Sequence, residues 1–295
     1  MTNNADGIST SQEMPPPRSP RSHLASQRSV RARDLRHALF MRSLPFIPFV
    51  ALIIAWSIGW EIVRPKLVTM PSITQVLDTA GQLWSNGELW ANISASMYRW
   101  GLGFAVGAVS GIVLGILTGL TPLIAKMLEP VIAFFMAISG IVWLPIAIVW
   151  FGLGTRTVVF IIWNSVFFLV FANTMLGVRS VATVLEDAAR TLGASRAHII
   201  TRVVIPGALP HVLEGLRSGV GFGWRALIAA EIIGATTGLG AMIYQAKEFL
   251  RSDVIFTGVI IIAVIGLILD MVLARLERRT IERWGLVTTE GGKTR

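Results

Sequence analysis

Residues 100–120 have the sequence WGLGFAVGAVSGIVLGILTGL, which contains no charged side chain. A run of about 20 apolar residues is long enough to cross the hydrocarbon core of a bilayer as a helix. Glycines recur at every fourth position of this run, at Gly103, Gly107, Gly111, Gly115 and Gly119. Because small residues at this spacing let two helices approach closely in lipid, the run predicts a membrane helix packed inside a helix bundle.

The composition of the whole chain is also typical of a membrane protein. Of its 295 residues, 53% are hydrophobic and 15% are charged, whereas soluble domains carry about 25% charged residues. The absence of cysteine excludes disulfides, thiolate metal sites and a cysteine nucleophile. A net charge of +9 could indicate nucleic-acid binding in a soluble protein, but here arginines flank the apolar runs. That distribution favours membrane topology over a nucleic-acid partner.

Apolar runs along the chain predict an all-α membrane protein with about six transmembrane helices. Five are clear: residues 44–63, 100–120, a stretch within 123–151, 157–176 and 254–272. The third is too long to cross upright, and Gly140 and Pro145 offer a place where it can kink or break. Residues 215–234 contain three charged side chains, so their hydropathy is equivocal.

The distribution of arginine decides the sixth run and the topology. Both tails are rich in arginine, so both termini should be cytoplasmic, and that requires an even number of crossings. We therefore expect residues 215–234 to cross, in a multi-pass membrane protein with both termini in the cytoplasm. A cleaved signal peptide at residues 44–63 is disfavoured because Arg64-Pro65-Lys66 replaces a small-residue cleavage site.

Four regions follow from this topology. Residues 1–42 form a disordered basic cytoplasmic tail, 43–98 the first span with a periplasmic amphipathic segment, 99–280 the transmembrane core, and 281–295 a cytoplasmic tail. In the amphipathic segment, Ser72 and Gln75 predict a capping box, and Ser85-Asn86-Gly87 ends the helix. This helix is expected on the outer membrane surface, with substrate gating as the alternative.

The longest cytoplasmic loop, residues 178–212, predicts two short helices. Gly193 can cap the end of the first helix, and Ser195 can cap the start of the second. Pro206 and Pro210 are expected to stop the second helix before the fifth span. Such an apolar-faced hairpin either lies against the membrane or docks a soluble partner.

This loop resembles the EAA motif of binding-protein-dependent ABC importer permeases. That motif is E-A-A, three residues, Gly, nine residues, then I-x-L-P, and the chain has DAARTLGA at 187–194 and VVIP at 203–206. Asp187 stands at the Glu position, so its contact is weaker or is supplied by Glu186. The resemblance implies an ATPase-coupling loop whose residues are Glu186, Asp187, Ala188, Ala189, Gly193, Ala194 and Pro206.

Over residues 65–285 the chain looks like the nitrate/sulfonate/taurine branch of these permeases. The segments that carry the likeness are Met70-Pro71-Ser72, the glycine-rich second run, Trp150-Phe151-Gly152, AAEIIG at 229–234, Gly238-Leu239-Gly240 and Leu269-Asp270. The likeness implies a type I importer fold, a permease homodimer in membrane lipid, two cytoplasmic ATPase subunits and an extracytoplasmic substrate-binding protein. It implies no cofactor, and as cargo an alkanesulfonate, taurine or nitrate, although close relatives also move vitamin precursors.

Charged and polar side chains inside the predicted spans are candidates for the translocation pathway, because they are costly in lipid. Arg225 and Glu231 are six residues apart, about 120° around a helix, so they are not obvious mutual partners. Arg225 could attract an anionic substrate, or it could belong to a structural ion pair or an interface. Asn164 joins them as a candidate, because it and Asn173 should face other helices.

Catalytic and metal-site patterns are missing from the sequence. No HExxH, no GxSxG and no pair of histidines at metal-ligand spacing occurs. Residues 291–294, GGKT, lack the first glycine of a P-loop, since Val287 stands there. The chain is thus expected to be a transporter subunit and not an enzyme. A stand-alone secondary transporter or channel is the alternative, and a membrane enzyme is less favoured.

Overall fold

The computed structural model describes residues 47–63 and 70–283. The predicted tail at 1–42, the first residues of the run at 44–63 and the GGKT segment lie outside the described residues. The chain divides into two units, residues 1–64 and 65–295, which we describe separately. The first contributes α2 (Ile47–Val63), an apolar helix of 17 residues on the first predicted run.

The second unit is built of helices throughout its described residues. They are α3 (Ile73–Ser85), α4 (Glu88–Leu120), α5 (Pro122–Ala137), η2 (Gly140–Trp143), α6 (Leu144–Phe151), α7 (Thr155–Ser180), α8 (Thr183–Thr191), α9 (Arg196–Ile199), η3 (Ile200–Val204), α10 (Ile205–Gly234), α11 (Leu239–Glu248) and α12 (Ser252–Arg283). Four segments are long and apolar enough to cross a membrane: α4, α7, Arg196–Gly234 and most of α12. The bent pair of α5 with η2 and α6 makes a fifth if the two parts form one broken span. This confirms the predicted all-α membrane fold.

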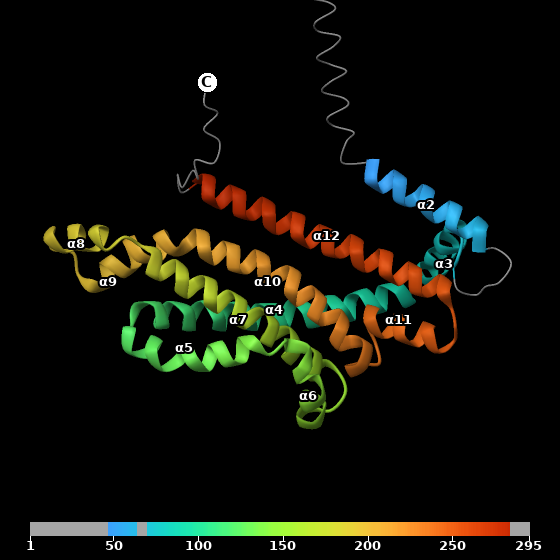
Figure 1. Ribbon diagram of the computed structural model, residues 1–295, viewed down its shortest axis with the longest axis horizontal. Helices are drawn as coiled ribbons and strands as arrows, with labels where there is room; N and C mark the ends of the chain where they lie inside the picture. Colours follow the sequence, from blue (N-terminus) through green and yellow to red (C-terminus); the bar gives the residue numbers. More distant parts are fainter. Residues whose placement is uncertain (1–46, 64–69, 284–295) are drawn as a thin grey trace, which may run out of the picture. The chain divides into compact units, whose positions relative to one another are not determined.

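The glycines of α4 lie directly against α7. A Cβ built on any of Gly103, Gly107, Gly111, Gly115 or Gly119 would lie 2.6–2.9 Å from an atom of α7. Real Cβ atoms do not approach this closely, so only glycine allows this helix spacing. Figure 1 shows α4 and α7 running side by side. The predicted packing role of this glycine series is confirmed.

Helix α10 also packs on α7, through the same kind of contact. A Cβ on Gly215 would lie 2.8 Å from Cβ of Asn173, and one on Gly223 would lie 2.8 Å from Cγ2 of Val166. Asn173 therefore faces a neighbouring helix, as expected. We call α4, α7 and α10 the three-helix core. Its centre is formed by fully buried apolar side chains: Val158, Ile161, Ile162, Val166, Val170, Leu227 and Ala230.

Helix α3 has the predicted capping box. The Ser72 hydroxyl accepts a hydrogen bond from the Gln75 backbone N–H (3.1 Å), and the Gln75 side chain accepts one from the Ser72 N–H (2.9 Å). The helix ends at the cap Asn86. Its buried Thr79 donates to Asp253 of α12 at 2.9 Å. Helix α3 is therefore attached to α12, while its place on the outer membrane surface stays a prediction.

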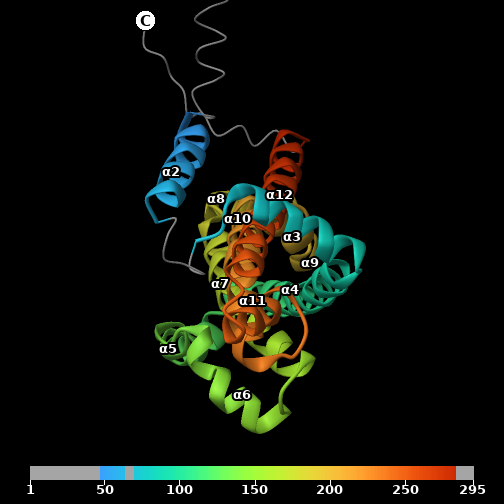
Figure 2. The ribbon, with the colours of Figure 1, turned by 90° about the vertical axis from the view of Figure 1, so that its right-hand side faces the viewer.

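The third predicted run breaks where glycine permits it. Helix α5 ends at Ala137, and the following η2–α6 segment turns away by 87°. Figure 2 shows α6 running across the direction of α5. A Cβ on Gly140 would lie 2.6 Å from Oγ of Ser165, so the break also brings the chain close to α7. Pro145 lies in the first turn of α6, where proline is tolerated.

The prediction that Pro206 and Pro210 end the second loop helix is wrong. Residues Arg196–Gly234 form one continuous span of 39 residues, with Pro206 in the first turn of α10 and Pro210 inside it. The five residues before Ile205 are π-helical. A π turn widens the helix and relocates carbonyls that an interior proline would otherwise clash with. The two prolines therefore modify the helix locally and do not stop it.

Gly111→Ala should destabilise the permease, because its new Cβ would meet backbone atoms of α7, Phe167 O at 2.9 Å and Phe171 N at 3.1 Å. Overpacking of this kind costs about 1–3 kcal/mol, so thermal unfolding in detergent should begin at a lower temperature. The matched control is Gly101→Ala on the same helix, whose Cβ meets nothing within 4 Å. Equal stability of the two variants would contradict the packing assigned to α4.

Candidate functional site

The loop at 178–212 contains a compact hairpin of α8 and α9, and we call residues 183–199 the coupling hairpin. Gly193 has φ +80°, a conformation that side chains rarely adopt, and it ends α8. Its N–H donates to Arg190 O at 2.9 Å, and the Ala194 N–H donates to Ala189 O at 3.0 Å. The Ser195 hydroxyl accepts from the His198 N–H at 3.3 Å at the start of α9. The predicted caps at Gly193 and Ser195 are confirmed.

The coupling hairpin has an attached face and a free face. Ala189 and Ala194 pack against a small core made by Val178, Ile199, Val204 and Ala208. On α8, Ala188 is exposed, and Leu192 beyond its end has 88% of its surface exposed. Leu192 and Ala188 thus form an exposed apolar surface at the end of the helix bundle. Within the described residues, nothing covers this surface.

Acidic side chains of the motif lie on the same helix and contact one arginine. The Arg190 guanidinium lies 3.9 Å from a carboxylate oxygen of Glu186 and 3.7 Å from one of Asp187. The side chain of Asp187 is 71% exposed and that of Glu186 is 29% exposed. Both carboxylates are therefore only loosely paired and can reach a second protein.

The hairpin continues directly into the membrane core. Helix α9, the π segment and α10 form one helical segment from Arg196 to Gly234. At 1.5 Å per residue, such a segment spans roughly 58 Å. Figure 1 shows α8 and α9 at one end of the second unit and α11 at the other. If the hairpin is displaced, the Arg196–Gly234 segment can therefore carry that displacement from one end of the unit to the other.

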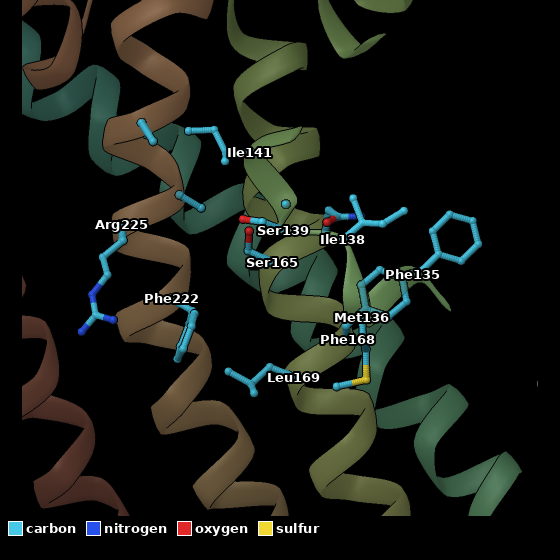
Figure 3. Close-up of a pocket in the computed structure, with 14 residues that line it drawn as sticks. Phe135, Met136, Ile138, Ser139, Ile141, Ser165, Phe168, Leu169, Phe222 and Arg225 are labelled. Atoms are coloured by element: carbon cyan, nitrogen blue, oxygen red, sulfur yellow. The ribbon is translucent and has the colours of Figure 1, made fainter. Parts of the chain in front are cut away.

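A cavity of about 360 Å³ lies beside the break between α5 and η2. Its walls are mainly apolar and come from α5, η2, α7 and α10 (Figure 3). The polar side chains that line it are Ser139, Asn164, Ser165 and Arg225. Of the predicted pathway residues, the structure therefore brings Asn164 and Arg225 to one cavity. Glu231 does not line it.

Arg225 lies at the edge of this cavity. Its side chain is exposed, and its guanidinium carbon is 5.4 Å from the centroid of the Phe222 ring. Figure 3 shows the guanidinium group turned away from Ser139 and Ser165. Asn164 by contrast is 6% exposed and belongs to the cavity wall. Arg225 is thus an exposed cation at the cavity edge, while Asn164 is a buried amide in the cavity wall.

Glu231 forms a buried ion pair with Arg99 of α4, at 2.8 Å between Nη1 and Oε1. Arg99 is not among the predicted site residues, because it precedes the expected start of the second span at residue 100. Helix α4 instead begins at Glu88, so Arg99 lies inside it. The sequence does contain a pattern that could have indicated this site. Ser96 and Arg99 are three residues apart, which puts two polar side chains on one helix face. Both bind Glu231.

Within the described residues, no group of three or more His, Asp or Glu side chains could hold a metal ion. The site consists of an exposed hairpin, a helix that runs from it into the core, and a cavity with one exposed arginine at its edge. This arrangement can bind a soluble partner and transmit its movement, and it presents no constellation for covalent chemistry.

Known proteins share this arrangement of sequence and fold. The family described as binding-protein-dependent transport system inner membrane component matches residues 111–282. The taurine transport system permease protein TauC of Escherichia coli (strain K12) is 37% identical over 234 residues, which are 78% of this chain and 85% of that protein. The aliphatic sulfonates transport permease protein SsuC of Bacillus subtilis (strain 168) is 33% identical over 233 residues, covering 79% and 84%.

A solved structure described as an amino acid ABC transporter with histidines has the same fold. It aligns with a TM-score of 0.56 and 19% identity over 68% of this chain and 97% of that chain. The relatives are described as transport permeases and not as enzymes. The chain therefore belongs to the family of inner membrane components of binding-protein-dependent transport systems, as a multi-pass permease subunit of an ABC importer.

Proposed function

We propose that this permease imports a small sulfonate, such as taurine or an alkanesulfonate, with nitrate as the alternative anion. The observation that carries the proposal is the 37% identity to a taurine permease over most of both chains. The cavity at the α5–η2 break supports it, because it combines apolar walls with one arginine and one buried amide. A guanidinium group and hydrogen-bond donors suit a sulfonate head, and apolar walls suit a short carbon chain.

In this proposal, the translocation pathway passes the cavity, with Arg225 as the exposed cation and Asn164 as a buried hydrogen-bonding group. Glu231 has a structural role instead, because its carboxylate is fully buried against α4. A free carboxylate in the pathway of an anion would repel the cargo. The charge of Glu231 is instead paired with Arg99, which agrees with anion transport.

The coupling hairpin is proposed as the docking site for the ATPase. Leu192 and Ala188 supply an apolar contact, and Asp187 with Glu186 supply exposed carboxylates. Ala189, Gly193 and Ala194 keep the hairpin compact, and Pro206 starts α10 behind it. Both chain termini are placed in the cytoplasm with the hairpin, in agreement with the arginine distribution.

The working assembly is a permease homodimer in lipid with two ATPase subunits and one extracytoplasmic binding protein. A stand-alone secondary transporter would have no use for a solvent-exposed apolar hairpin at the end of its longest helix. Apolar surface of this kind normally marks a protein interface. The hairpin therefore favours the importer over the stand-alone transporter.

The cargo is tested by uptake into proteoliposomes that contain the permease, its ATPase and its binding protein. Labelled taurine, a labelled alkanesulfonate and labelled nitrate are supplied in turn, with and without ATP inside. We expect ATP-dependent uptake of one of the two sulfonates and none without the ATPase. Uptake that is driven by an ion gradient in the absence of the ATPase would refute the importer.

Arg225 variants in the same assay test the pathway. Arg225→Ala should lower the uptake rate about 10-fold, since hydrogen bonds to charged groups contribute about 1.5–3 kcal/mol. Arg225→Lys keeps the charge but loses the planar fork of donors, so its uptake should lie between that of Arg225→Ala and the parent. An unchanged rate in Arg225→Ala would remove this arginine from the pathway.

Ala188→Arg should abolish binding of the ATPase, because it adds a long cation to the exposed face of α8. The fold should persist, because Ala188 is exposed and the added side chain can extend into solvent. Co-purification of the ATPase with the permease measures the effect. Ala91→Arg is the matched control, an exposed helical alanine on α4. Normal ATPase recovery with Ala188→Arg would exclude this face as the docking site.

A further inference from the structure

The corner between α10 and α11 is held by polar contacts from two other segments, α4 and the residue that precedes α7. Glu231 accepts hydrogen bonds from Arg99 Nη1 (2.8 Å), from the Ser96 hydroxyl (2.8 Å to Oε2) and from the Gly240 N–H (3.0 Å). Arg99 also donates to the carbonyl oxygen of Thr237 at 2.5 Å and to its hydroxyl at 2.8 Å. One ion pair therefore joins α4, α10 and the connection between α10 and α11.

Further hydrogen bonds tie the same corner to α4 and to the start of α7. Ser96 Oγ accepts from the Leu239 N–H at 2.9 Å, and Asn92 Oδ1 accepts from the Gly238 N–H at 2.8 Å. The Gly154 N–H, just before α7, donates to the carbonyl oxygen of Gly234 at 2.6 Å. Every helix of the three-helix core thus contributes to the corner.

The side chains and backbone of this corner are buried and tightly packed. The side chain of Glu231 is 0% exposed and that of Arg99 is 7% exposed. A Cβ on Gly240 would lie 2.7 Å from the carbonyl oxygen of Ile228, and one on Gly238 would collide with the Glu231 carboxylate. Separating the two charges would leave both unpaired in a low-dielectric interior, which is strongly unfavourable.

The corner and the coupling hairpin lie at opposite ends of one helix. Glu231 is three residues before the end of the Arg196–Gly234 segment, and α9 of the hairpin begins it. Between the two ends, glycine contacts fix α10 to α7 and α7 to α4. The Arg196–Gly234 segment itself has no sharp break. The 87° bend in the described residues of the second unit lies between α5 and η2.

We propose that Arg99 and Glu231 form a latch that makes the coupling hairpin, the three-helix core and the α10–α11 corner one moving body. The latch delivers the displacement of the hairpin to the far end of the permease during the ATP cycle. Arg99 and Glu231 are positioning residues in this mechanism, since neither lines the cavity. The proposal rests on ATPase docking at the hairpin, as proposed above.

A purely structural ion pair would make a different prediction, and a double variant separates the two. Buried ion pairs can often be replaced by apolar side chains of similar volume without loss of stability. Arg99→Met/Glu231→Met should therefore fold and bind the ATPase, while it loses the contacts to Thr237 and Gly240. If the pair were only structural, this variant would also transport normally.

The experiment uses the absence of cysteine from the chain, which allows single labelling sites. An environment-sensitive fluorophore is attached to Thr201→Cys, exposed beside the hairpin, or to Phe249→Cys, 78% exposed in the turn after α11. Fluorescence of the complete reconstituted complex is compared between the nucleotide-free and ATP-trapped states. Uptake per ATP hydrolysed is measured in parallel, in the parent and in the double variant.

With the parent ion pair, both labels should respond to ATP. In the double variant, the Thr201→Cys label should still respond, the Phe249→Cys label should not, and uptake per ATP should fall at least about 10-fold. Equal responses of the Phe249→Cys label in parent and double variant would overturn the latch. Failure of the Thr201→Cys label to respond in the parent would refute the docking proposal, and the latch with it.

Discussion

Close contact between the glycines of α4 and the surface of α7 is the constraint on which the rest of the structure depends. In lipid, helices gain nothing from hiding apolar surface, so they associate through tight packing and polar contacts. Five glycines at every fourth position supply that packing over the length of the span. Helix α10 then packs on α7 through Gly215 and Gly223, and its own position follows from that contact. The cavity and the hairpin are both positioned by this three-helix core.

The proposed coupling depends on an unbroken connection through α10. The exposed hairpin lies at one end of the Arg196–Gly234 segment, and the buried Arg99–Glu231 pair lies near its other end. Arg225 lies on the same helix between them, at the edge of the cavity. The proposed ATPase contact, the proposed cargo contact and the α10–α11 corner therefore lie on or beside one continuous helix. The π-helical residues before Pro206 preserve this continuity where a proline would otherwise interrupt it.

Much of this fold could be predicted from the sequence because its signals are local. The glycine series, the capping box of Ser72 and Gln75 and the cap at Gly193 each depend on residues within one or two turns of a helix. The errors and omissions concern relations that local patterns do not encode. Pro206 was expected to end a helix because proline removes a hydrogen bond, but the π turn compensates for it. The partner of Glu231 was missed because Arg99 lies 132 residues away in the sequence.

The most direct test of this account is a structure of the complete importer in its nucleotide-free and ATP-trapped states. We predict that the packing of Gly107 on Val166 and the pairing of Arg99 with Glu231 are the same in both. The Arg196–Gly234 helix should stay continuous and move together with the coupling hairpin. A helix that bends at Pro206 between the two states, or an α4 that slides along α7, would contradict the account.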